Sequence, residues 1–547
     1  MNVVVAAAAA CVPAWQRDVV AALRAAPGFD VRVVRAGTAA PWTPPRGGEA
    51  RFAGPALAPA RIAFDTESLP NDARIPTPSP GTTAGTSANA AVFSNADLVV
   101  DLTESLADTG ARLGVWSFRL GDGGDATLPF AREIAGGARV VTVDLVRRSG
   151  GERAILRSGH FAVSSSYSVT ARLAFAEAAA WPAVLAAVAD RVTLHATPET
   201  EPPRGAALRG VRRFVFVATA PFRAVTALLS GLVAVDQWNA GFASGGARAL
   251  LAGGPLRDIR WLPAPPPRTF VADPFLVERD GVRALFVEEY DYKRDRGVID
   301  ALVLDAQDRV VERARIIDLP THLSYPFPVE IDGVLHLVPE NAAGGEVAAY
   351  RCVRFPDRWE RAFAVFPSFD GVDTTLFRHD ERWWAFCTRY THGSNVALFG
   401  FHAADVRGPW TPHAQNPIVV DVRCARAAGP PFVVDGALYR PGQDCSTTYG
   451  GAVVIARIDE LDPLRYAETI VSRIEAPVTG PYPDGLHTVG VSGDTIVLDG
   501  KRRYRDLRYV MRLGRWWKAR RARRSALATL GDGSRPSSNP RPETPID

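Results

Sequence analysis

The sequence predicts a two-part protein, with an open α/β domain that has a doubly wound parallel sheet over residues 1–200 and an all-β five-bladed propeller over residues 237–512. Strands alternate with helices in the first part, as in proteins with a parallel sheet. In the second part, residues 270–505 contain a repeat of about 50 residues with several strands in each unit, as in propeller blades. The composition, 47% hydrophobic and 22% charged over 547 residues, is that of an ordinary globular protein.

The first part has short apolar runs that predict strands and longer periodic runs that predict helices. Strands are expected at 3–9, 31–34, 98–102 and 140–145. Helices are expected at 15–25, 170–180 and 183–192. Residues 36–90 are rich in Pro, Gly and Thr, which predicts a long loop or insertion.

Two short motifs in this part resemble the N-terminal domain of formyltransferases. They are Gly114-Val-Trp-Ser-Phe-Arg119 and Ala154-Ile-Leu156. The resemblance implies a triad of Asn, His and Asp, but Ser117, Arg119 and Gly151 stand at those positions. Formyl transfer needs a general base and a group that stabilises an oxyanion. We therefore expect a degenerate formyltransferase-like domain without that chemistry.

Residues 201–236 are predicted to form a helical linker. The longest apolar stretch, 214–235, has Pro221 and Arg223 in its interior, and both disfavour a membrane span. A helix that lies on the protein or on a membrane surface is expected instead.

The C-terminal segment is basic. Residues 501–524 hold twelve basic residues and one acidic residue, Asp506, and they include Trp516 and Trp517. This pattern suits an anionic membrane surface, although a solvated arginine-rich tail would look the same. Residues 513–547 are predicted to be a basic, largely disordered tail. The expected location is cytoplasmic, peripheral at the inner face of the membrane.

Charge and cysteine content limit the other partners. A net charge of +4 is too small for a general nucleic-acid binder, so no nucleic acid is expected. The five cysteines form no CxxC pair and the nine histidines form no HExxH motif. We therefore predict reduced thiols, no metal site and no cofactor.

The repeat in residues 270–505 has a constant internal offset. Each unit begins with a marker residue, continues as a strand, and turns at an aspartate seven residues later. Asp-Gly between two strands is a strong hairpin signal. The marker and turn residues are 273 and 280, 325 and 332, 373 and 380, 428 and 435, and 487 and 494. Five such units predict five blades.

The first strand of each blade lines the channel of a propeller, so the five markers should meet at one end of it. They are Asp273, Tyr325, Asp373, Ala428 and His487. A second ring, eight residues after each turn, holds Glu288, Glu340, Thr388, Gln443 and Arg502. Carboxylates, a phenol and an imidazole around one axis predict a sugar site whose acids have perturbed pKa values.

These markers resemble those of the five-bladed glycosidases of family 43. The resemblance implies that Asp273 is the catalytic base, that Asp373 orients the site and tunes its pKa, and that His487 is the channel histidine. The general-acid Glu of that family is replaced by Ala428.

A second resemblance, over 237–512, is to the N-terminal domain of plant glucosamine inositolphosphorylceramide transferases and their bacterial homologues. Its motifs include Phe270-Val-Ala-Asp-Pro-Phe275, Ser324-Tyr-Pro-Phe327 and Tyr439-Arg-Pro-Gly-Gln-Asp444.

Without an acid at position 428, an ordinary glycoside is a poor substrate, whereas a sugar phosphate leaves as an anion that cations can stabilise. We therefore expect glycosyl transfer from a phosphate-activated sugar donor, with Asp273 as base on the acceptor. The residues expected to bind the substrate are Tyr325, Glu288, Arg423, Arg426, Arg440, Gln443, Asp444 and His487.

Two alternatives remain open. Glu340 or Glu288 could supply the missing acid in a family 43-like hydrolase. A non-catalytic propeller could instead bind a glycan on an aromatic platform.

Overall fold

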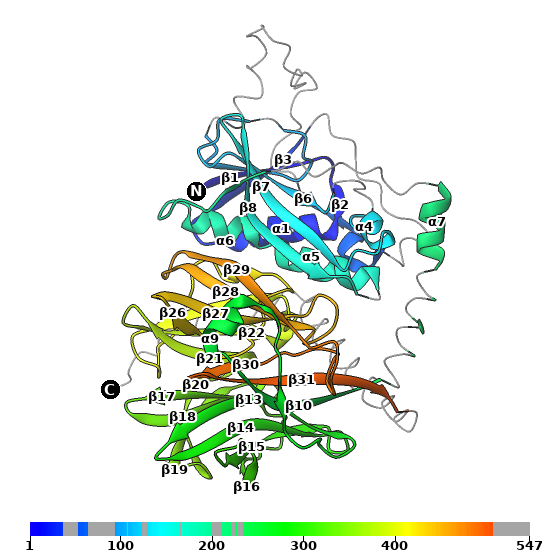
Figure 1. The fold of residues 1–547 in the computed structure, drawn as a ribbon. Coiled ribbons are helices and arrows are strands. Elements are labelled where there is room, and N and C mark those ends of the chain that lie inside the picture. Colours follow the sequence, from blue (N-terminus) through cyan, green and yellow to red (C-terminus); the bar gives the residue numbers. More distant parts are fainter. Residues whose placement is uncertain are drawn as a thin grey trace.

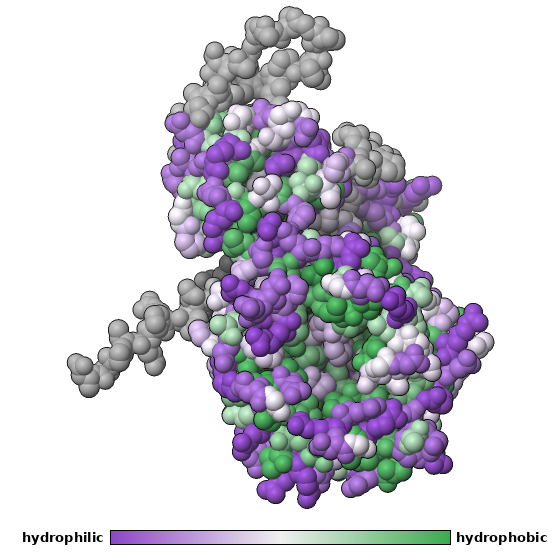
Figure 2. Space-filling model, turned by 60° about the vertical axis from the view of Figure 1, so that its left-hand side comes forward, coloured by the Kyte–Doolittle hydropathy of each residue, from purple (hydrophilic) through white to green (hydrophobic). Residues whose placement is uncertain are grey.

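A computed structural model describes residues 1–36, 53–63, 93, 95–106, 108–122, 128–164, 166–199, 210–219, 222, 225–226, 229 and 234–506. Figure 1 shows two lobes, an N-terminal α/β domain stacked on a larger all-β body. Figure 2 shows the same two lobes, with hydrophilic residues over much of both and hydrophobic residues gathered toward the middle of the larger one. The predicted loop at 36–90 falls mostly outside the described residues, as does the tail at 513–547.

The N-terminal domain contains a seven-stranded mixed sheet. Its order is β3 (Asp30–Arg35), β1 (Asn2–Ala7), β5 (Leu98–Asp101), β6 (Val115–Leu120), β7 (Val140–Ser149), β8 (Glu152–Ala162) and β9 (Thr197–Pro198). The first four strands are parallel and the remaining pairs are antiparallel. A small separate ladder pairs β2 (Cys11–Pro13) with β4 (Pro59–Arg61), after the short helix η1 (Pro55–Leu57).

The prediction of a parallel sheet therefore holds for the first four strands and is wrong for β7, β8 and β9. Gly150 and Gly151, both with positive φ, close a tight hairpin between β7 and β8, so the chain returns antiparallel without a crossover helix. The described helices also cover only one face of the sheet. They are α1 (Ala14–Ala25), α4 (Ala131–Ala135), α5 (Tyr167–Ala178) and α6 (Trp181–Val188), whose buried residues all belong to one core.

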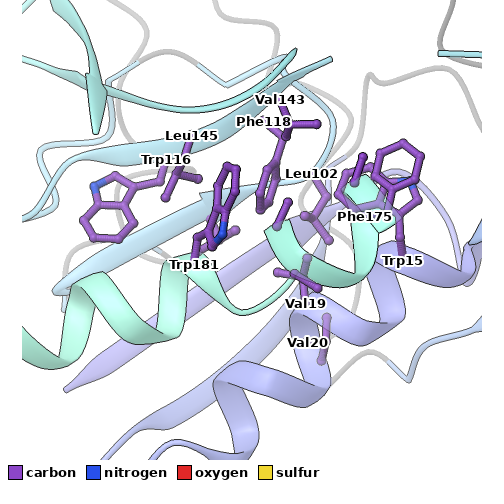
Figure 3. Packing of buried hydrophobic residues seen from close by; sticks show 14 of the residues in the cluster. Trp15, Val19, Val20, Leu102, Trp116, Phe118, Val143, Leu145, Phe175 and Trp181 are labelled. Carbon is purple, nitrogen blue, oxygen red and sulfur yellow. The ribbon is translucent and has the colours of Figure 1, made fainter. Parts of the chain in front are cut away.

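Aromatic side chains fill that core between helices and sheet (Figure 3). Trp15 of α1 stacks on Phe175 of α5 with ring centroids 4.9 Å apart, and Phe118 of β6 meets Trp15 edge-on. The stretch 167–188 is long and apolar enough to cross a membrane by length and composition alone, and 61% of it is buried inside the domain. Much of this stretch is buried because its side chains, such as Phe175 and Trp181, belong to the hydrophobic core of the domain.

The second lobe has the five predicted blades, each a separate antiparallel sheet. The first three blades are consecutive along the chain. The first comprises β13 (Thr269–Arg279), β14 (Val282–Asp291), β15 (Arg296–Leu304) and β16 (Val310–Ile317). The second comprises β17 (Ser324–Ile331), β18 (Val334–Glu340), β19 (Val347–Arg354) and β20 (Arg358–Phe366). The third comprises β21 (Gly371–His379), β22 (Arg382–Arg389), β23 (Ala397–Ala403) and β24 (Thr411–Pro412), with β25 (Val419–Val420) beside β23. Short helices η2 (Ala342–Gly344) and η3 (Tyr390–His392) lie in loops of the second and third blades.

The last two blades take strands from both ends of the propeller. The fourth blade contains β26 (Phe432–Val434), β27 (Ala437–Asp444), β28 (Ala452–Leu461) and β29 (Tyr466–Glu475), with β11 (Gly254–Pro255) along its edge. In the fifth, β30 (Val489–Ser492) and β31 (Thr495–Arg505) are joined by β10 (Ala234–Ser244) and β12 (Arg260–Trp261). Helix α9 (Gly246–Ala252) follows β10. The pairing of β10 with β31, from Ala234 opposite Arg505 to Ser244 opposite Thr495, closes the ring.

The domains contact each other through β8 and the loop after β25. The amide of Val422 donates to the carbonyl of His160 at 3.0 Å, and Arg157 donates to the carbonyl of Gln415 at 3.0 Å. Val420 lies in the N-terminal core. The loop that begins at this contact continues into the propeller channel, where it supplies Arg426 to the site.

Candidate active site

A pocket of about 170 Å³ opens at one end of the propeller channel. Its walls combine acidic, cationic and aromatic side chains from the first, second, fourth and fifth blades and the loops beside them. The lining residues are Trp238, Phe270, Asp273, Glu288, Tyr290, His322, Ser324, Glu340, Arg426, Tyr449 and His487. A larger hollow of about 540 Å³ beside α9 contains only two arginines and one aspartate as charged lining residues, and it has no comparable cluster of acids.

The backbone at three marker residues has an unusual conformation that turns their side chains into the channel. Asp273, Tyr325 and Asp373 have φ values of 50°, 44° and 50°, in the left-handed region that non-glycine residues rarely adopt. At each of them the pairing with the next strand shifts register, as in a β-bulge. Such strain is typical of functional sites, where the surrounding fold holds it in place.

Asp273 is buried and held from two neighbouring blades. Its Oδ1 accepts a hydrogen bond of 2.6 Å from Thr488, and its Oδ2 accepts one of 3.0 Å from the amide of Tyr325. Burial raises the pKa of Asp273 to about 6, an effect that the nearby imidazole of His487 partly offsets. At pH 7 the group is therefore largely ionised, with a proton affinity suited to a general base.

Asp373 forms the anionic side of a buried ion pair. Arg426 Nε donates to its Oδ2 at 2.6 Å, and Gln443 donates to the same oxygen at 3.1 Å. The guanidinium of Arg426 also lies 3.6 Å from Glu340 and 4.9 Å from the ring of Tyr449. Arg426 therefore links two acids of the site to its aromatic wall.

Glu340 and Glu288 lie opposite the marker strands, at the ends of β18 and β14. Burial, with the Asp373 carboxylate adding to it, raises the pKa of Glu340 well above its ordinary value. Its Oε2 is buried and has no hydrogen-bond partner among the described residues. Burial also raises the pKa of Glu288, which is 3.8 Å from His322 Nε2. In both carboxyls, burial favours the protonated form.

His487 lies behind Asp273. Its Nδ1 is 2.6 Å from Asp499, its Nε2 is 3.5 Å from Asp273, and its ring stacks on Trp238 with centroids 4.0 Å apart. The pKa of His487 is raised because Asp499 and Asp273 outweigh its burial. Asp499 also accepts hydrogen bonds from the amides of Asp273, His487 and Thr488. Donor atoms of Asp273, His487 and Asp499 lie within 4.8 Å of one another, close enough to hold a metal ion, although all three are already engaged within the protein.

Several residues predicted for the site lie elsewhere. Arg423 forms an ion pair with Asp421 near the domain contact, and Arg440 is buried between strands with Glu468 at 2.6 Å. Asp444 forms an ion pair with Arg473. Arg423 and Arg440 were predicted to bind the substrate but do not line the pocket, because each is paired with an acid outside it. In the second ring, Thr388 bonds to the carbonyl of Ser394 and Arg502 to Gln237, so neither joins the pocket.

Two further predicted residues support the pocket without lining it. Tyr325 is fully buried and its hydroxyl lies 2.9 Å from that of Thr375. Gln443 bonds to Asp373 and to the carbonyl of Ala427. Ala428 is also fully buried, and it brings no polar side chain to the fourth marker position.

The sequence analysis did not identify Trp238, His322, Tyr449 or Asp499. Trp238 lies on β10, which precedes the first repeat unit, so the period gave no sign that it completes the last blade. Gly450 lets the Tyr449 loop approach Trp238, because a Cβ there would lie 2.5 Å from the indole. Asp499 carried one usable signal, since it is an acid that directly follows the apolar run 496–498 of its strand.

The propeller matches a known family of proteins. Residues 262–480 match the family model described as glucosamine inositolphosphorylceramide transferase 1, N-terminal. The predicted resemblance is confirmed. A rice protein of that name (Oryza sativa subsp. japonica) is 35% identical over 214 residues, and the Arabidopsis thaliana protein is 32% identical over 211 residues. Each match covers 38% of this chain, and the chain spans only 28% of the length of either plant relative.

Solved glycosidases have a similar arrangement of strands. One is Zg3597, a family 117 glycoside hydrolase from Zobellia galactanivorans, with a TM-score of 0.32 and 11% identity over 49% of this chain and 90% of its own. Another is CoXyl43, a family 43 β-xylosidase/α-arabinofuranosidase from a compost metagenome, with a TM-score of 0.31 and 13% identity over 43% of this chain and 90% of its own.

Proposed function

We propose that the propeller pocket binds one sugar unit and catalyses glycosyl transfer by acid–base chemistry. The observation that carries the proposal is that two buried acids, Asp273 and Glu340, line one aromatic-walled pocket, with the pKa of Glu340 raised well above its ordinary value. The names of the plant relatives, which are transferases, support the same class of reaction.

The pocket is smaller than typical ligand sites of about 300–1,000 Å³, so it suits a single ring rather than an oligosaccharide or a whole nucleotide sugar. Trp238 and Tyr449 form the aromatic part of the wall that a bound sugar would contact. Any further part of a donor or acceptor would lie at the rim, near Phe270 and Tyr290.

In the proposed reaction, Asp273 takes the proton of the acceptor hydroxyl as it attacks the anomeric carbon. Glu340 gives its proton to the departing oxygen, so the bond to the leaving group breaks as the new glycosidic bond forms. Asp373, paired with Arg426, favours the protonated form of Glu340. The net result is one bond formed, one broken, and one proton moved from acceptor to leaving group.

A phosphate-activated donor remains a proposal with weaker support. Arg426 is the one arginine in the pocket lining, and it is already paired with Asp373. Departure of a phosphate would therefore depend on Glu340 more than on a cluster of arginines. Hydrolysis uses the same two acids with water as acceptor, and the reaction products distinguish the two.

The test measures turnover of Asp273→Asn and Glu340→Gln on glycosides with poor and good leaving groups. We expect Asp273→Asn to lose at least about 10²-fold on both, the lower range for removal of a general base. Glu340→Gln should lose activity only on the poor leaving group, because a good one departs without a proton. Asp280→Asn and Glu330→Gln, both on the exposed surface, are matched controls. Unchanged turnover in Asp273→Asn would contradict the proposal, and sugar binding without any turnover would favour a glycan-binding propeller.

We also infer that the N-terminal domain has no formyltransferase activity, and its likeness to that family stays a prediction. Ser117 is buried on β6, Arg119 is paired with Asp144 at 2.6 Å and Glu199 at 2.9 Å, and Gly151 lies in the β7–β8 turn. None of these groups can act as a general base on a formyl donor. Turnover of a formyl-folate by residues 1–200 would contradict this.

A further inference from the structure

We propose that the apolar side of the linker, formed by Phe214, Val215, Phe222, Val225 and Leu229, binds an anionic lipid bilayer next to the mouth of the pocket. These five side chains are exposed by 73%, 49%, 71%, 51% and 57% respectively. Phe214 and Phe222 are the only phenylalanines among the exposed large hydrophobic residues that the structure describes. Adjacent exposed apolar residues of this size mark an interaction surface.

The helix geometry directs this side outward. In α7 (Gly210–Ala218), Phe216 is buried against Tyr167 of the N-terminal domain, with ring centroids 6.4 Å apart. That contact fixes which side of α7 faces the protein, and Phe214 lies on the opposite side. Phe222, Val225 and Leu229 are helical and spaced three and four residues apart, the spacing of one helix face.

The charge of the chain favours a bilayer over other apolar partners. Residues 202–235 contain five arginines and no acidic residue. The basic run at 501–524 continues directly from β31, whose last residue, Arg505, pairs with Ala234 at the end of the linker. Apolar side chains flanked by arginines are the usual composition of a segment that lies in an anionic membrane interface.

The linker and the basic run both join the propeller at the rim of the pocket. Val235 packs in one cluster with Phe270, Tyr290 and Tyr504, and both Phe270 and Tyr290 line the pocket. Leu229 and Ala234 are five positions apart in the sequence, so their Cα atoms lie within about 18 Å of each other. Figure 1 shows α7 on the side of the molecule where β10 begins and β31 ends.

A bilayer bound by this side would lie close to the pocket mouth. Membrane binding by this side does not depend on the glycosyl transfer proposed above.

The experiment is co-sedimentation of the full chain with vesicles of phosphatidylcholine and phosphatidylserine, and with vesicles of phosphatidylcholine alone. We expect the wild type to bind the anionic vesicles and Phe214→Ser/Phe222→Ser to bind them roughly tenfold or more weakly, since two large apolar side chains leave the interface. Val215→Ser/Val225→Ser should also weaken binding, whereas the matched control Val433→Ser/Val478→Ser, on exposed valines of the propeller, should not.

Three outcomes would overturn the proposal. They are equal vesicle binding by the Phe variant and the wild type, equal binding of the wild type to neutral and anionic vesicles, and a dimer in solution that the Phe variant dissociates, which would assign the surface to a second copy of the chain. Thermal unfolding of each variant shows whether it is folded. Turnover of a soluble sugar substrate separates the two proposals, because the Phe variant should keep that activity while losing the vesicles.

Discussion

Asp273, Tyr325 and Asp373 share a backbone conformation that their sequence gives little reason to expect. A non-glycine residue in the left-handed region costs roughly 1–2 kcal/mol, so three of them around one channel mean that the blades impose the geometry. The repeat did predict which residues lie there. It could not predict the bulge, which depends on pairing with the second strand of each blade.

The partners of each acid were harder to predict than the acids themselves. Asp273, Glu288, Glu340 and Arg426 were all candidates from the sequence, and all four line the pocket. Arg440 was also a candidate but pairs with Glu468 instead. Spacing along the chain identifies the strand on which a residue lies, whereas the choice of ion-pair partner depends on the packing between strands.

The pH dependence of activity should reflect two groups of the pocket. Because the pKa of Asp273 is about 6, activity should rise with pH through about 6 as the base ionises. It should fall at higher pH as Glu340, whose pKa is raised, loses its proton. The alkaline fall should appear in the wild type on a poor-leaving-group substrate and be absent on a good one, on which Glu340→Gln should keep the acid rise. An acid rise that is unchanged in Asp273→Asn would contradict the assignment.

Glu288 should make the protein less stable as the pH rises. Its carboxyl is protonated more readily in the folded state than in the unfolded state, where its pKa is near the ordinary value of 4.5. Below that value both states are protonated and the residue has no ionisation cost. Above it the unfolded state ionises first, so stability falls by up to about 1.4 kcal/mol per pH unit until the folded pKa is reached.

The measurement is the free energy of unfolding of Glu288→Gln and of the wild type, by urea titration between pH 4 and 8. The variant should gain on the wild type as pH rises above about 4.5. Glu330→Gln, at an exposed glutamate, is the matched control for the loss of one carboxyl. A Glu288→Gln gain that is independent of pH would contradict the prediction.

At the scale of elements, the hairpin turns follow the sequence closely. Asp280, Asp332, Asp380 and Asp435 all have φ values between 46° and 52°, and in three of these turns the next residue is glycine with φ near 75°. Asp-Gly suits such a two-residue turn because both positions need positive φ. The third blade is the exception, since Glu381 occupies the glycine position at a φ of 60°.

Glu381→Gly should therefore stabilise the protein. Relief of the left-handed strain outweighs the entropy that glycine loses on folding, for a net gain of about 0.5–1 kcal/mol. The change should be visible in the midpoint of urea unfolding with no change in slope. The reverse substitution in the second blade, Gly333→Glu, should lower stability by a similar amount. A destabilised Glu381→Gly variant would show that the Glu381 side chain makes a compensating contact.

The N-terminal sheet shows where element prediction failed. The strands and helices that were expected occurred close to their predicted positions, but β6 and β8 were not predicted, and β7 pairs antiparallel with both of them. The signal was present in Gly150-Gly151, which closes a hairpin that a crossover helix would have replaced. Alternation of strands and helices alone does not determine direction once two strands follow each other without a helix between them.

At the scale of the whole molecule, the fifth blade depends on both ends of the propeller. The family match covers residues 262–480 and leaves out β10, β30 and β31. It therefore also leaves out Trp238 and His487, which line the pocket, and Asp499, which pairs with His487. The family match therefore covers less of the propeller than is needed to form the pocket.

Truncated chains should show that the propeller needs the strands of the fifth blade. A chain ending at residue 506 keeps β31, so its propeller should unfold cooperatively and bind sugar. A chain ending at 480 loses the closing strand, and we expect its propeller transition to be lost while the N-terminal domain still unfolds as in the longer chain. Circular dichroism during urea unfolding measures both transitions. Sugar binding by the shorter chain would contradict the role of the fifth blade.

The closure by β10 and β31 also sets the order in which the site forms during synthesis. β10 emerges from the ribosome before the first four blades and must wait, unpaired, for a strand that ends 261 residues after it. Asp273 meets Asp499, which binds its amide, only after 226 further residues have been made. Long waits of this kind slow folding and expose strand edges to other chains. The pocket therefore forms last, and a nascent chain has no activity before its final blade is complete.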